Sequence, residues 1–346
     1  MTNILPDFEL KIGAKLDIDG IFVNKKPKIT KRILVVSDKN TQHIASEFTK
    51  TPMILQGKKD DIRLKPTKEN AELIIAALDG YDSILAVGSG TINDLCKYSS
   101  FLAKKPYSVV PTAPSMNGYL SSNASIEVKG KKEGLTCHLP RNIYIDLEIL
   151  KNSPTRLIKS GFGDAMARQT AQSDWFLAQT LKKTKKLPYN QLAFDVSAES
   201  EQYLIRHYKK LNAVDEDFVY NLMLNLLLSG IGMHISGGSH PASGGEHAIC
   251  HYLCEKHSDR MDQFFHGEQV SCATMAMIWI QKQFKDYKNF HIPQNMQSMF
   301  DCVGLPYHYS HLKLKVDEWD DALRNAHKIR DRFGFLDLFN SDKKTT

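Results

Sequence analysis

The pattern of apolar residues changes near residue 150, and this change constrains the fold more than any other feature of the sequence. Before it, short β-branched runs alternate with stretches of helical spacing. Strands are expected at 32–37, 83–87, 107–110 and 142–145, and helices at 68–78 and 91–103. A hairpin is expected from strands at 125–128 and 135–138, with its turn around Gly130. Strands that alternate with helices of this length predict a parallel sheet with crossover helices.

After about residue 147 the apolar residues recur at helical spacing and few β-branched runs remain. Helices are expected at 164–181, 197–210, 216–231, 243–256, 268–284 and 315–333. The expected fold class is therefore α/β plus all-α. We divide the 346 residues into an α/β domain, 1–150, and a helical domain, 151–346.

Composition and charge exclude several classes of protein. The net charge of +6 is modest and scattered, and no basic stripe with interleaved aromatic residues predicts a nucleic-acid partner. The six cysteines form no C-x-x-C pair, which favours free thiols in a reducing compartment. No signal peptide is apparent, and polar residues interrupt the longest apolar stretch, 218–235, which we interpret as a core helix. A cytoplasmic protein without a membrane span is expected.

A glycine turn follows the predicted strand at 83–87. Gly88, Ser89, Gly90 and Thr91 connect this strand directly to a helix. Residues without Cβ atoms permit a tight turn, and a helix N-terminus attracts phosphate. Because the third glycine of the usual dinucleotide fingerprint is missing, an ordinary strand-to-helix turn is the alternative.

Two other strand ends carry polar residues. Asp38 follows the strand at 32–37, where a carboxylate can accept hydrogen bonds from ribose hydroxyls, and a turn aspartate is the alternative. Small and polar residues, 111–118, follow the strand at 107–110. Ligands of open α/β sheets bind beyond the carboxyl ends of the strands, so the three strand ends predict one binding site. A plain polar loop at 111–118 is the alternative.

One carboxylate and two imidazoles in the helical half suggest a metal site. Asp164 follows Gly163 at an expected helix start, where an N-cap role is the alternative. His247 and His251 share one helix face at i and i+4, and His266 begins a further helix. Such a ligand set suits zinc, nickel or iron, although thirteen histidines make chance pairs expected. Two adjacent residues are candidate acceptors for the histidine rings: Glu246 and Glu268.

Ordered motifs give the sequence a family resemblance. They are GSGTIND (88–94), PTAPSMNGYLSSNASI (111–126), SGFGDAMARQTAQSDW (160–175), HPASGGEHAICH (240–251), FHGEQV (265–270) and IRDRFGFLDL (329–338). From Asp38 to about Phe333 the chain resembles the sn-glycerol-1-phosphate dehydrogenases, within the larger family of iron-containing alcohol dehydrogenases, glycerol dehydrogenases and dehydroquinate synthases. The resemblance implies a Rossmann-like NAD(P)-binding domain, a helical metal-binding domain and a homodimer.

The resemblance also implies roles for particular residues. The implied cofactor contacts are Asp38 at the adenosine ribose, Gly88, Ser89, Gly90, Thr91 and Asp94 at the pyrophosphate, and Thr112, Ser115 and Ser121 beside the nicotinamide. The implied metal ligands are Asp164, His247 and His266. The implied substrate contacts are Asn117, Asp164 and His251. In the catalytic mechanism that we expect, His251, or a water that it holds, is the proton donor.

The expected activity is metal-dependent, NAD(P)-linked interconversion of dihydroxyacetone phosphate and sn-glycerol 1-phosphate. Asn117 departs from the family, which commonly has Asp at this position, and an amide carries no charge and cannot act as a base. The alternatives are a dehydrogenase of another polyol, sugar phosphate or alcohol, and a homologue that binds nucleotide and metal without turnover. Asp38 would repel a 2′-phosphate, but Lys39 could offset it, so the choice between NAD and NADP stays open.

Overall fold

The computed structural model describes residues 2–57, 62–184, 188–284, 287 and 295–342. The chain forms two compact units, and each is described by itself. Unit 1 comprises Met1–Ile158 and Val214–Gly230, and unit 2 comprises Lys159–Ala213 and Ile231–Thr346. Unit 1 thus extends past residue 150 and includes a later segment that the sequence pattern assigned to the helical half.

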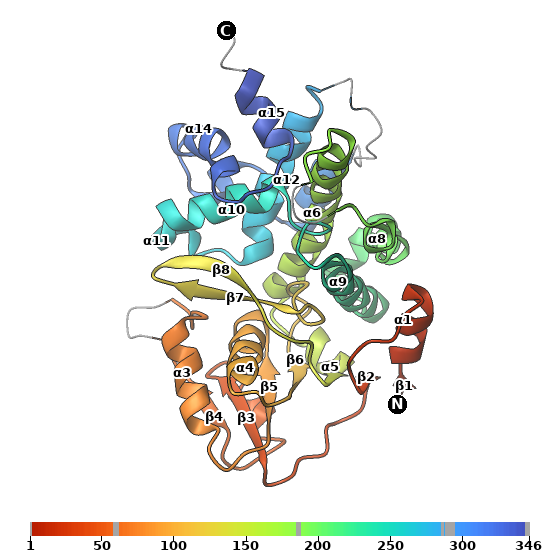
Figure 1. Ribbon diagram of the computed structural model, residues 1–346, viewed down its shortest axis with the longest axis vertical. Coiled ribbons are helices and arrows are strands. Elements are labelled where there is room, and N and C mark those ends of the chain that lie inside the picture. The colour runs from red at the N-terminus through yellow and green to blue at the C-terminus, as the bar shows by residue number, and fades with distance from the viewer. Residues whose placement is uncertain (1, 58–61, 185–187, 285–286, 288–294, 343–346) are drawn as a thin grey trace. The chain divides into compact units, whose positions relative to one another are not determined.

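Unit 1 is built on a seven-stranded sheet (Figure 1). Its strands are β1 (Thr2–Asn3), β2 (Gly20–Val23), β3 (Ile33–Asp38), β4 (Met53–Leu55), β5 (Ser83–Gly88), β6 (Tyr107–Pro111) and β9 (Asn142–Ile145). Their order is β1-β2-β9-β6-β5-β3-β4, and each neighbouring pair is parallel except β1 and β2. The four predicted strands are confirmed as β3, β5, β6 and β9.

Helices cover both faces of this sheet. They are α1 (Leu5–Ile12), α2 (Gln42–Ala45), α3 (Lys68–Ala77), α4 (Gly90–Leu102) and α5 (Leu147–Lys151). Val35, Leu85 and Val110 pack with Ala45 of α2 in a core on one face. Alternate strand residues point to the opposite face. There α4 packs on β3, β5 and β6, with α3 beside it (Figure 1).

The predicted hairpin is present, but its second strand starts earlier than expected. Strands β7 (Asn123–Val128) and β8 (Lys131–Thr136) pair antiparallel. Lys129 and Gly130 join them with φ of 51° and 79°, which is the two-residue turn that suits the twist of a hairpin. The prediction placed the second strand at 135–138 because the sequence of β8 is too polar to indicate a strand.

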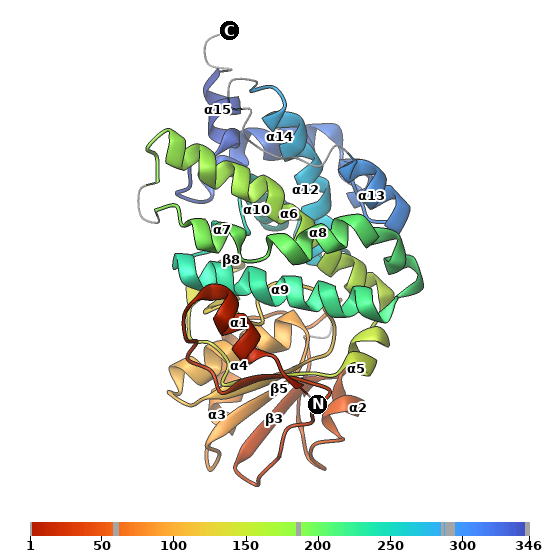
Figure 2. The ribbon, with the colours of Figure 1, turned by 90° about the vertical axis from the view of Figure 1, so that its right-hand side faces the viewer.

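The described residues of unit 2 form helices joined by loops and contain no strand (Figure 2). Its helices are α6 (Thr155–Thr180), α7 (Gln191–Asp195), α8 (Ala198–His207), α10 (Gly245–Lys256), α11 (Ser258–Met261), α12 (His266–Gln281), α13 (Met296–Val303), α14 (Val316–Asn325) and α15 (Phe335–Asp342), with short 3₁₀ turns at Tyr208–Ala213, Tyr309–Leu312 and Ala326–Lys328. Side chains of α10, α12, α14 and α15 form one hydrophobic core of this unit, around Leu253, Met277 and Phe335.

Two helix predictions in this half are wrong in their bounds. Helix α6 begins at Thr155, so Asp164 lies inside it and does not cap it. Gly163 suggested a helix start, but it lies inside the helix, where a Cβ would lie 2.4 Å from the carbonyl oxygen of Gly267. The helix predicted at 315–333 ends at Asn325, apart from a 3₁₀ turn, and the following chain makes side-chain contacts with residues 239–243.

Helix α9 (Glu216–Ser236) contributes residues to both units. Among the described residues it alone is long and apolar enough to cross a membrane, and 72% of its most apolar window is buried. A buried core helix passes the same test, as the sequence suggested. Within unit 1, a Cβ on Gly230 would lie 2.7 Å from the carbonyl oxygen of Asn117, so α9 packs directly on the chain that follows β6.

Candidate functional site

Three predicted metal ligands lie together in unit 2. Asp164 comes from α6, His247 from α10 and His266 from the first position of α12. One ligand atom from each lies within 4.8 Å of the other two. Nε2 of His247 is 3.4 Å from Oδ1 of Asp164, and Nε2 of His266 is 3.6 Å from the same oxygen. The imidazoles and the carboxylate therefore converge on one point from three helices.

Close contact between α6 and α12 brings Asp164 and His266 together. A Cβ on Gly267 would lie 1.7 Å from the carbonyl oxygen of Ser160, and one on Gly163 would lie 2.4 Å from the carbonyl oxygen of Gly267. The two backbones thus touch where the glycines stand, and Gly267 N donates to Ser160 Oγ at 2.9 Å. Since each glycine is the neighbour of a candidate ligand, this contact sets the distance between carboxylate and imidazole.

The N-terminus of α10 is fixed to α6 in a similar way. A Cβ on Gly244 would lie 2.8 Å from Cα of Ala171, and Gly245 N donates to Oδ2 of Asp174 at 2.7 Å. Thr170 Oγ1 donates to Oε2 of Glu246 at 2.8 Å. These contacts hold the first turn of α10, which carries His247.

The ring of His247 is held between two carboxylates. Oε1 of Glu246 lies 2.9 Å from Nδ1, while Nε2 faces Asp164. Burial lowers the pKa of His247, but the bonds to Asp164 and Glu246 outweigh burial and raise it above 6.5. Burial likewise raises the pKa of Glu246, but its bond to His247 and that residue's charge outweigh burial and lower it. Glu246 therefore takes the acceptor role that the sequence suggested for it.

The second suggested acceptor, Glu268, contacts the backbone at the start of α12. Its Oε2 accepts from Phe265 N at 2.7 Å, which caps the start of α12 at His266. Nδ1 of His266 lies 3.9 Å from Sγ of Cys250. Glu268 thus supports the position of His266 through the helix start.

The arrangement fits a divalent metal ion. Ligand atoms held about 2.1 Å from an ion in tetrahedral geometry lie about 3.4 Å apart, close to the 3.4 and 3.6 Å separations between Asp164 and the two histidines. Glu246 on the far nitrogen of His247 matches the carboxylate–histidine–metal pattern of protein metal sites. The His266 side chain is 35% exposed, which leaves one side of the cluster open to solvent or substrate.

His251 lies beside this cluster but not in it. It follows His247 by one turn of α10, and its Nε2 lies 2.7 Å from a guanidinium nitrogen of Arg330. Because a guanidinium can only donate, Nε2 accepts and a neutral ring carries its proton on Nδ1. Sequence reasoning did not single out Arg330 as a site residue, although the residue lies in the quoted motif at 329–338.

The predicted phosphate turn joins β5 to α4 in unit 1. Ser89 occupies the N-cap position, and the first helical bond runs from Asn93 N to Ser89 O at 3.0 Å. The N–H groups before it have no partner within the helix and can bind an anion. A Cβ on Gly88 would lie 2.6 Å from Cβ of Ile92, so glycine is needed here for the strand to enter the helix.

Asp38 is the last residue of β3, as predicted, and one of its carboxylate oxygens accepts hydrogen bonds from the residues that follow. Oδ1 accepts from Asn40 N at 2.9 Å and from Thr41 N and Thr41 Oγ1 at 3.0 Å. These bonds make Asp38 a turn aspartate, which was the alternative interpretation. Its second oxygen lies outside this set of bonds, so ribose binding stays a prediction.

Asp94 is held by the protein itself. Oδ2 accepts from Ser125 N at 3.0 Å, and Lys97 Nζ lies 3.9 Å from Oδ1. Burial raises the pKa of Asp94, although the charge of Lys97 and the bond from Ser125 act against this. Lys97 also donates to the carbonyls of Gly118 and Asn123 at 2.7 and 2.9 Å. The pair therefore fixes the chain after β6, and a pyrophosphate contact by Asp94 stays a prediction.

The remaining predicted residues follow β6. Thr112, Ser115 and Ser121 are buried, and Thr112 N donates to the carbonyl of Gly88 at 3.2 Å. That bond places the segment beside the phosphate turn, as expected for neighbouring strand ends. Asn117 is partly exposed, and its amide lies 3.5 Å from Oγ of Ser229. Roles for these residues at the nicotinamide or the substrate stay predictions.

Comparisons with known proteins agree with this fold. Residues 14–154 match the model of the iron-containing alcohol dehydrogenase family. Glycerol-1-phosphate dehydrogenase [NAD(P)+] of Bacillus subtilis (strain 168) is 28% identical over 97% of this chain and 91% of the relative. The enzyme of the same name from Thermococcus kodakarensis is also 28% identical, over 93% and 89%.

Solved structures share the fold at low sequence identity. A probable glycerol dehydrogenase from Sinorhizobium meliloti 1021 aligns with a TM-score of 0.71 and 18% identity over 92% of each chain. Glycerol dehydrogenase from Schizosaccharomyces pombe aligns with a TM-score of 0.67 and 17% identity over 90% of this chain and 84% of that one. The fold therefore combines a Rossmann-like unit with a helical unit, as predicted.

These matches confirm the family resemblance. Over residues 14–154 the chain is similar to the iron-containing alcohol dehydrogenases. Among these, its sequence is similar over most of its length to the glycerol-1-phosphate dehydrogenases.

Proposed function

We propose that this chain is a metal-dependent, NAD(P)-linked oxidoreductase that interconverts dihydroxyacetone phosphate and sn-glycerol 1-phosphate. The convergence of Asp164, His247 and His266 within 4.8 Å carries the proposal, because this ligand set suits catalytic metal chemistry on a carbonyl. The names and near-complete coverage of the relatives support the substrate.

Asp164, His247 and His266 would hold a divalent ion, which we propose to be zinc, nickel or iron. Bound there, the ion would supply Lewis-acid polarisation of the substrate carbonyl. In the proposed roles Asp164 orients both imidazoles, and Glu246 fixes the tautomer of His247. A bound NAD or NADP would supply the hydride.

The β5–α4 turn would bind the pyrophosphate of that cofactor. Gly88, Ser89, Gly90 and Thr91 supply the turn and the first helical N–H groups. Asp38 would accept from the adenosine ribose, and the buried residues after β6 would line the nicotinamide side: Thr112, Ser115 and Ser121.

His251 is our candidate for the proton donor at the developing hydroxyl. With Arg330 donating to Nε2, the transferable proton of a neutral ring lies on Nδ1. The guanidinium therefore orients the ring and selects the tautomer. Asn117 would hydrogen-bond the substrate without contributing charge.

A direct test measures oxidation of the reduced cofactor with dihydroxyacetone phosphate before and after chelation. We expect activity to fall to background without metal and to return when zinc, nickel or iron is added. The variant His247→Ala should lose both metal stoichiometry and turnover. Full activity after complete metal removal would refute the proposed chemistry, and unchanged metal content in His247→Ala would refute the ligand assignment.

Asn117 favours one alternative, a dehydrogenase of a different polyol, sugar phosphate or alcohol. The family commonly has a charged residue at this position, and an amide presents a different hydrogen-bonding pattern to the substrate. Comparing kcat/KM for glycerol 1-phosphate, glycerol 3-phosphate, glycerol and other polyols decides between the two. Preference for a substrate other than glycerol 1-phosphate would favour the alternative.

The proposed enzyme is a cytoplasmic homodimer. All six cysteines are free thiols in the structure, which suits a reducing compartment. Light scattering coupled to size-exclusion chromatography would measure the mass of the assembly in solution. A monomeric mass at micromolar concentration would contradict the dimer.

A further inference from the structure

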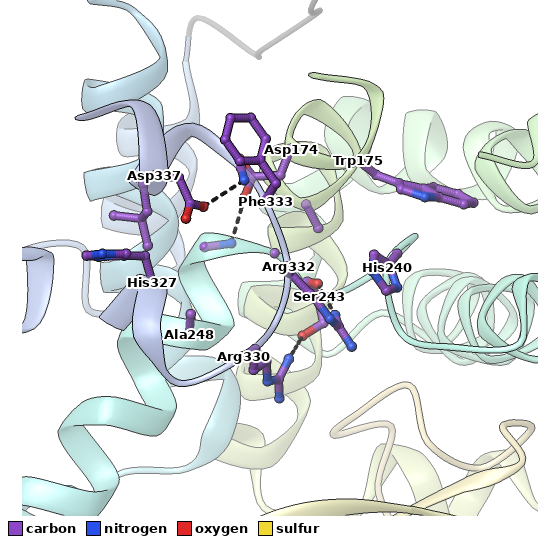
Figure 3. Close-up of a pocket in the computed structure, with 15 residues that line it drawn as sticks. Asp174, Trp175, His240, Ser243, Ala248, His327, Arg330, Arg332, Phe333 and Asp337 are labelled. Carbon is purple, nitrogen blue, oxygen red and sulfur yellow. Dashed lines mark hydrogen bonds between the residues drawn. The ribbon is translucent and has the colours of Figure 1, made fainter. Parts of the chain in front are cut away.

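Unit 2 contains a cavity beside the N-terminus of α10 (Figure 3). The centres of water molecules can occupy about 30 Å³ of it, within a wider opening of about 440 Å³ that includes open solvent. Arg330, Arg332, Ser243 and His240 line one part of it, and Asp174 and Asp337 line another. None of these residues belongs to the candidate metal cluster.

The two arginines bind only neutral groups. Arg330 donates to Oγ of Ser243 and to Nε2 of His251, both at 2.7 Å. Arg332 donates to the carbonyl of Ser243 at 2.7 Å and to Oγ of Ser239 at 2.6 Å. A guanidinium has five N–H donors, so these two bonds leave three N–H groups of each arginine without a bond to the residues that the structure describes. Within the described part of the chain, no carboxylate lies at ion-pair distance from either arginine.

Two cations held side by side in a half-buried cavity favour binding of an anion. Burial and the neighbouring charge of Arg330 lower the pKa of Arg332 to about 9, although the charge of Glu246 opposes this. Burial also lowers the pKa of Arg330. A dianion between the guanidiniums would relieve their mutual repulsion and satisfy donors that burial has removed from water.

The acidic residues of the cavity are engaged elsewhere. Oδ1 and Oδ2 of Asp174 accept from Phe335 N at 2.9 Å and Gly245 N at 2.7 Å. Oδ2 of Asp337 accepts from Gly334 N at 2.9 Å. Burial, and then the charge of Glu246, raise the pKa of Asp174 to about 7. These carboxylates therefore compete weakly with an external anion for the arginines.

His240 adds a further polar group to the arginine side of the cavity. Its Nδ1 is buried and makes no hydrogen bond with the described residues. Burial, followed by the charges of Arg332 and Arg330, lowers the pKa of His240 to about 3, so its ring is neutral at physiological pH. A neutral imidazole that carries its proton on Nδ1 could donate to an anion between the arginines.

We propose that Arg330 and Arg332 bind the phosphate group of the substrate, a phosphomonoester dianion. Guanidiniums suit this group because their paired N–H donors match phosphate oxygens. Arg330 contacts His251, which follows the candidate ligand His247 by one helical turn, a rise of about 6 Å. This inference rests on the proposed function, since it assigns the phosphate end of the same substrate.

The first experiment measures binding of inorganic phosphate to the full-length protein by calorimetry, without substrate or turnover. We expect Arg332→Gln to weaken phosphate binding about 10- to 100-fold, because a hydrogen bond to a charged group contributes about 1.5–3 kcal/mol. Arg332→Lys should recover part of this affinity, since it restores the charge but not the planar fork. Arg324→Gln is the matched control, because Arg324 is an exposed arginine of unit 2.

The second experiment compares kcat/KM for dihydroxyacetone phosphate and for unphosphorylated dihydroxyacetone. Arg332→Gln should lower the first value about 10- to 100-fold and leave the second unchanged within about twofold. If Arg330 and Arg332 only hold the 239–243 loop, both values will fall together and the melting temperature will fall with them. That result, or wild-type phosphate affinity in Arg332→Gln, would overturn the inference.

The two proposals can fail separately. If the wild-type protein binds phosphate through Arg332 but turns over neither ketone, the anion site stands and the proposed activity fails. If the wild-type protein reduces dihydroxyacetone phosphate and Arg332→Gln does so equally well, the activity stands and the anion site fails. The double variant Arg330→Lys/Arg332→Lys keeps both charges, so it tests fork geometry even if the Gln variant does not fold.

Discussion

Glu246 lies directly behind its neighbour His247, with Oε1 2.9 Å from Nδ1 of the ring. The glutamate is completely buried, and Thr170 and the backbone of Gly244 hold its two oxygens. The ring of His247 therefore has one tautomer and one orientation in which Nε2 faces Asp164. Glu246, which is not a proposed metal ligand, thus orients the candidate ligand His247.

We predict that Glu246→Gln lowers metal affinity about 10- to 100-fold, because the ring of His247 loses its charged acceptor. Competition with a chromophoric chelator measures the affinity. Glu255→Gln is the control, since Glu255 lies exposed on the same helix. Equal metal affinity in Glu246→Gln and the wild type would show that the contact has no influence on the site.

Metal affinity should decrease as pH falls. Burial lowers the pKa of His247, but Asp164 and Glu246 raise it above 6.5 overall, so protons compete with the metal already above pH 6.5. The metal-free protein should show the opposite trend. The contribution of His247 to its stability is complete below pH 6.5 and is lost as pH rises through the raised pKa. Metal titrations and chemical unfolding from about pH 6 to about pH 8 test both trends. Metal affinity that does not change with pH would contradict the first trend.

The contact between α6 and α12 should not tolerate a side chain. A Cβ on Gly267 would lie 1.7 Å from the carbonyl oxygen of Ser160, so Gly267→Ala must push the helices apart. We expect a loss of about 1–3 kcal/mol or more in the free energy of unfolding, and reduced metal stoichiometry because Asp164 separates from His266. Gly134→Ala is the control, since a Cβ there meets nothing within 4 Å. Unfolding by urea measures the stability, and wild-type metal content in Gly267→Ala would refute the coupling.

Asp38→Asn should shift the cofactor preference towards NADP. The amide oxygen can keep the turn bonds from Asn40 and Thr41 while the negative charge disappears. If Asp38 lies beside the adenosine ribose, removal of its repulsion should raise kcat/KM for NADP relative to NAD about tenfold. The ratio is measured with both cofactors at saturating substrate. An unchanged ratio would place the ribose elsewhere.

The central strands could be predicted because their sequences are β-branched and end in clear turns. RILVVS and SILAV carry this signal, and both form neighbouring strands of unit 1. Strands β1 and β4 were missed because they have three residues or fewer, and β2 (GIFV) was missed because its four residues show little alternation. Short edge strands depend on their neighbours for pairing more than on their own sequence.

The site could be predicted in part. The candidate ligands were proposed from residue type and resemblance, but their convergence depends on backbone contacts that no local pattern reveals. Gly163 illustrates this, because a glycine before Asp164 indicated a helix start although the residue lies within α6. The arginine pair was missed for a related reason. Its partners, Ser239 and Ser243, precede it by 87 residues or more, and only tertiary structure brings them together.

The return of the chain to unit 1 at Val214–Gly230 limits how the protein can be divided. A fragment that stops at Ile158 would contain every strand of the sheet, but it would lack the part of α9 that packs on the chain after β6. Such a fragment should aggregate or bind cofactor poorly because this apolar contact is exposed to water. During synthesis, unit 1 can be completed only after the first portion of unit 2, Lys159–Ala213, has been translated.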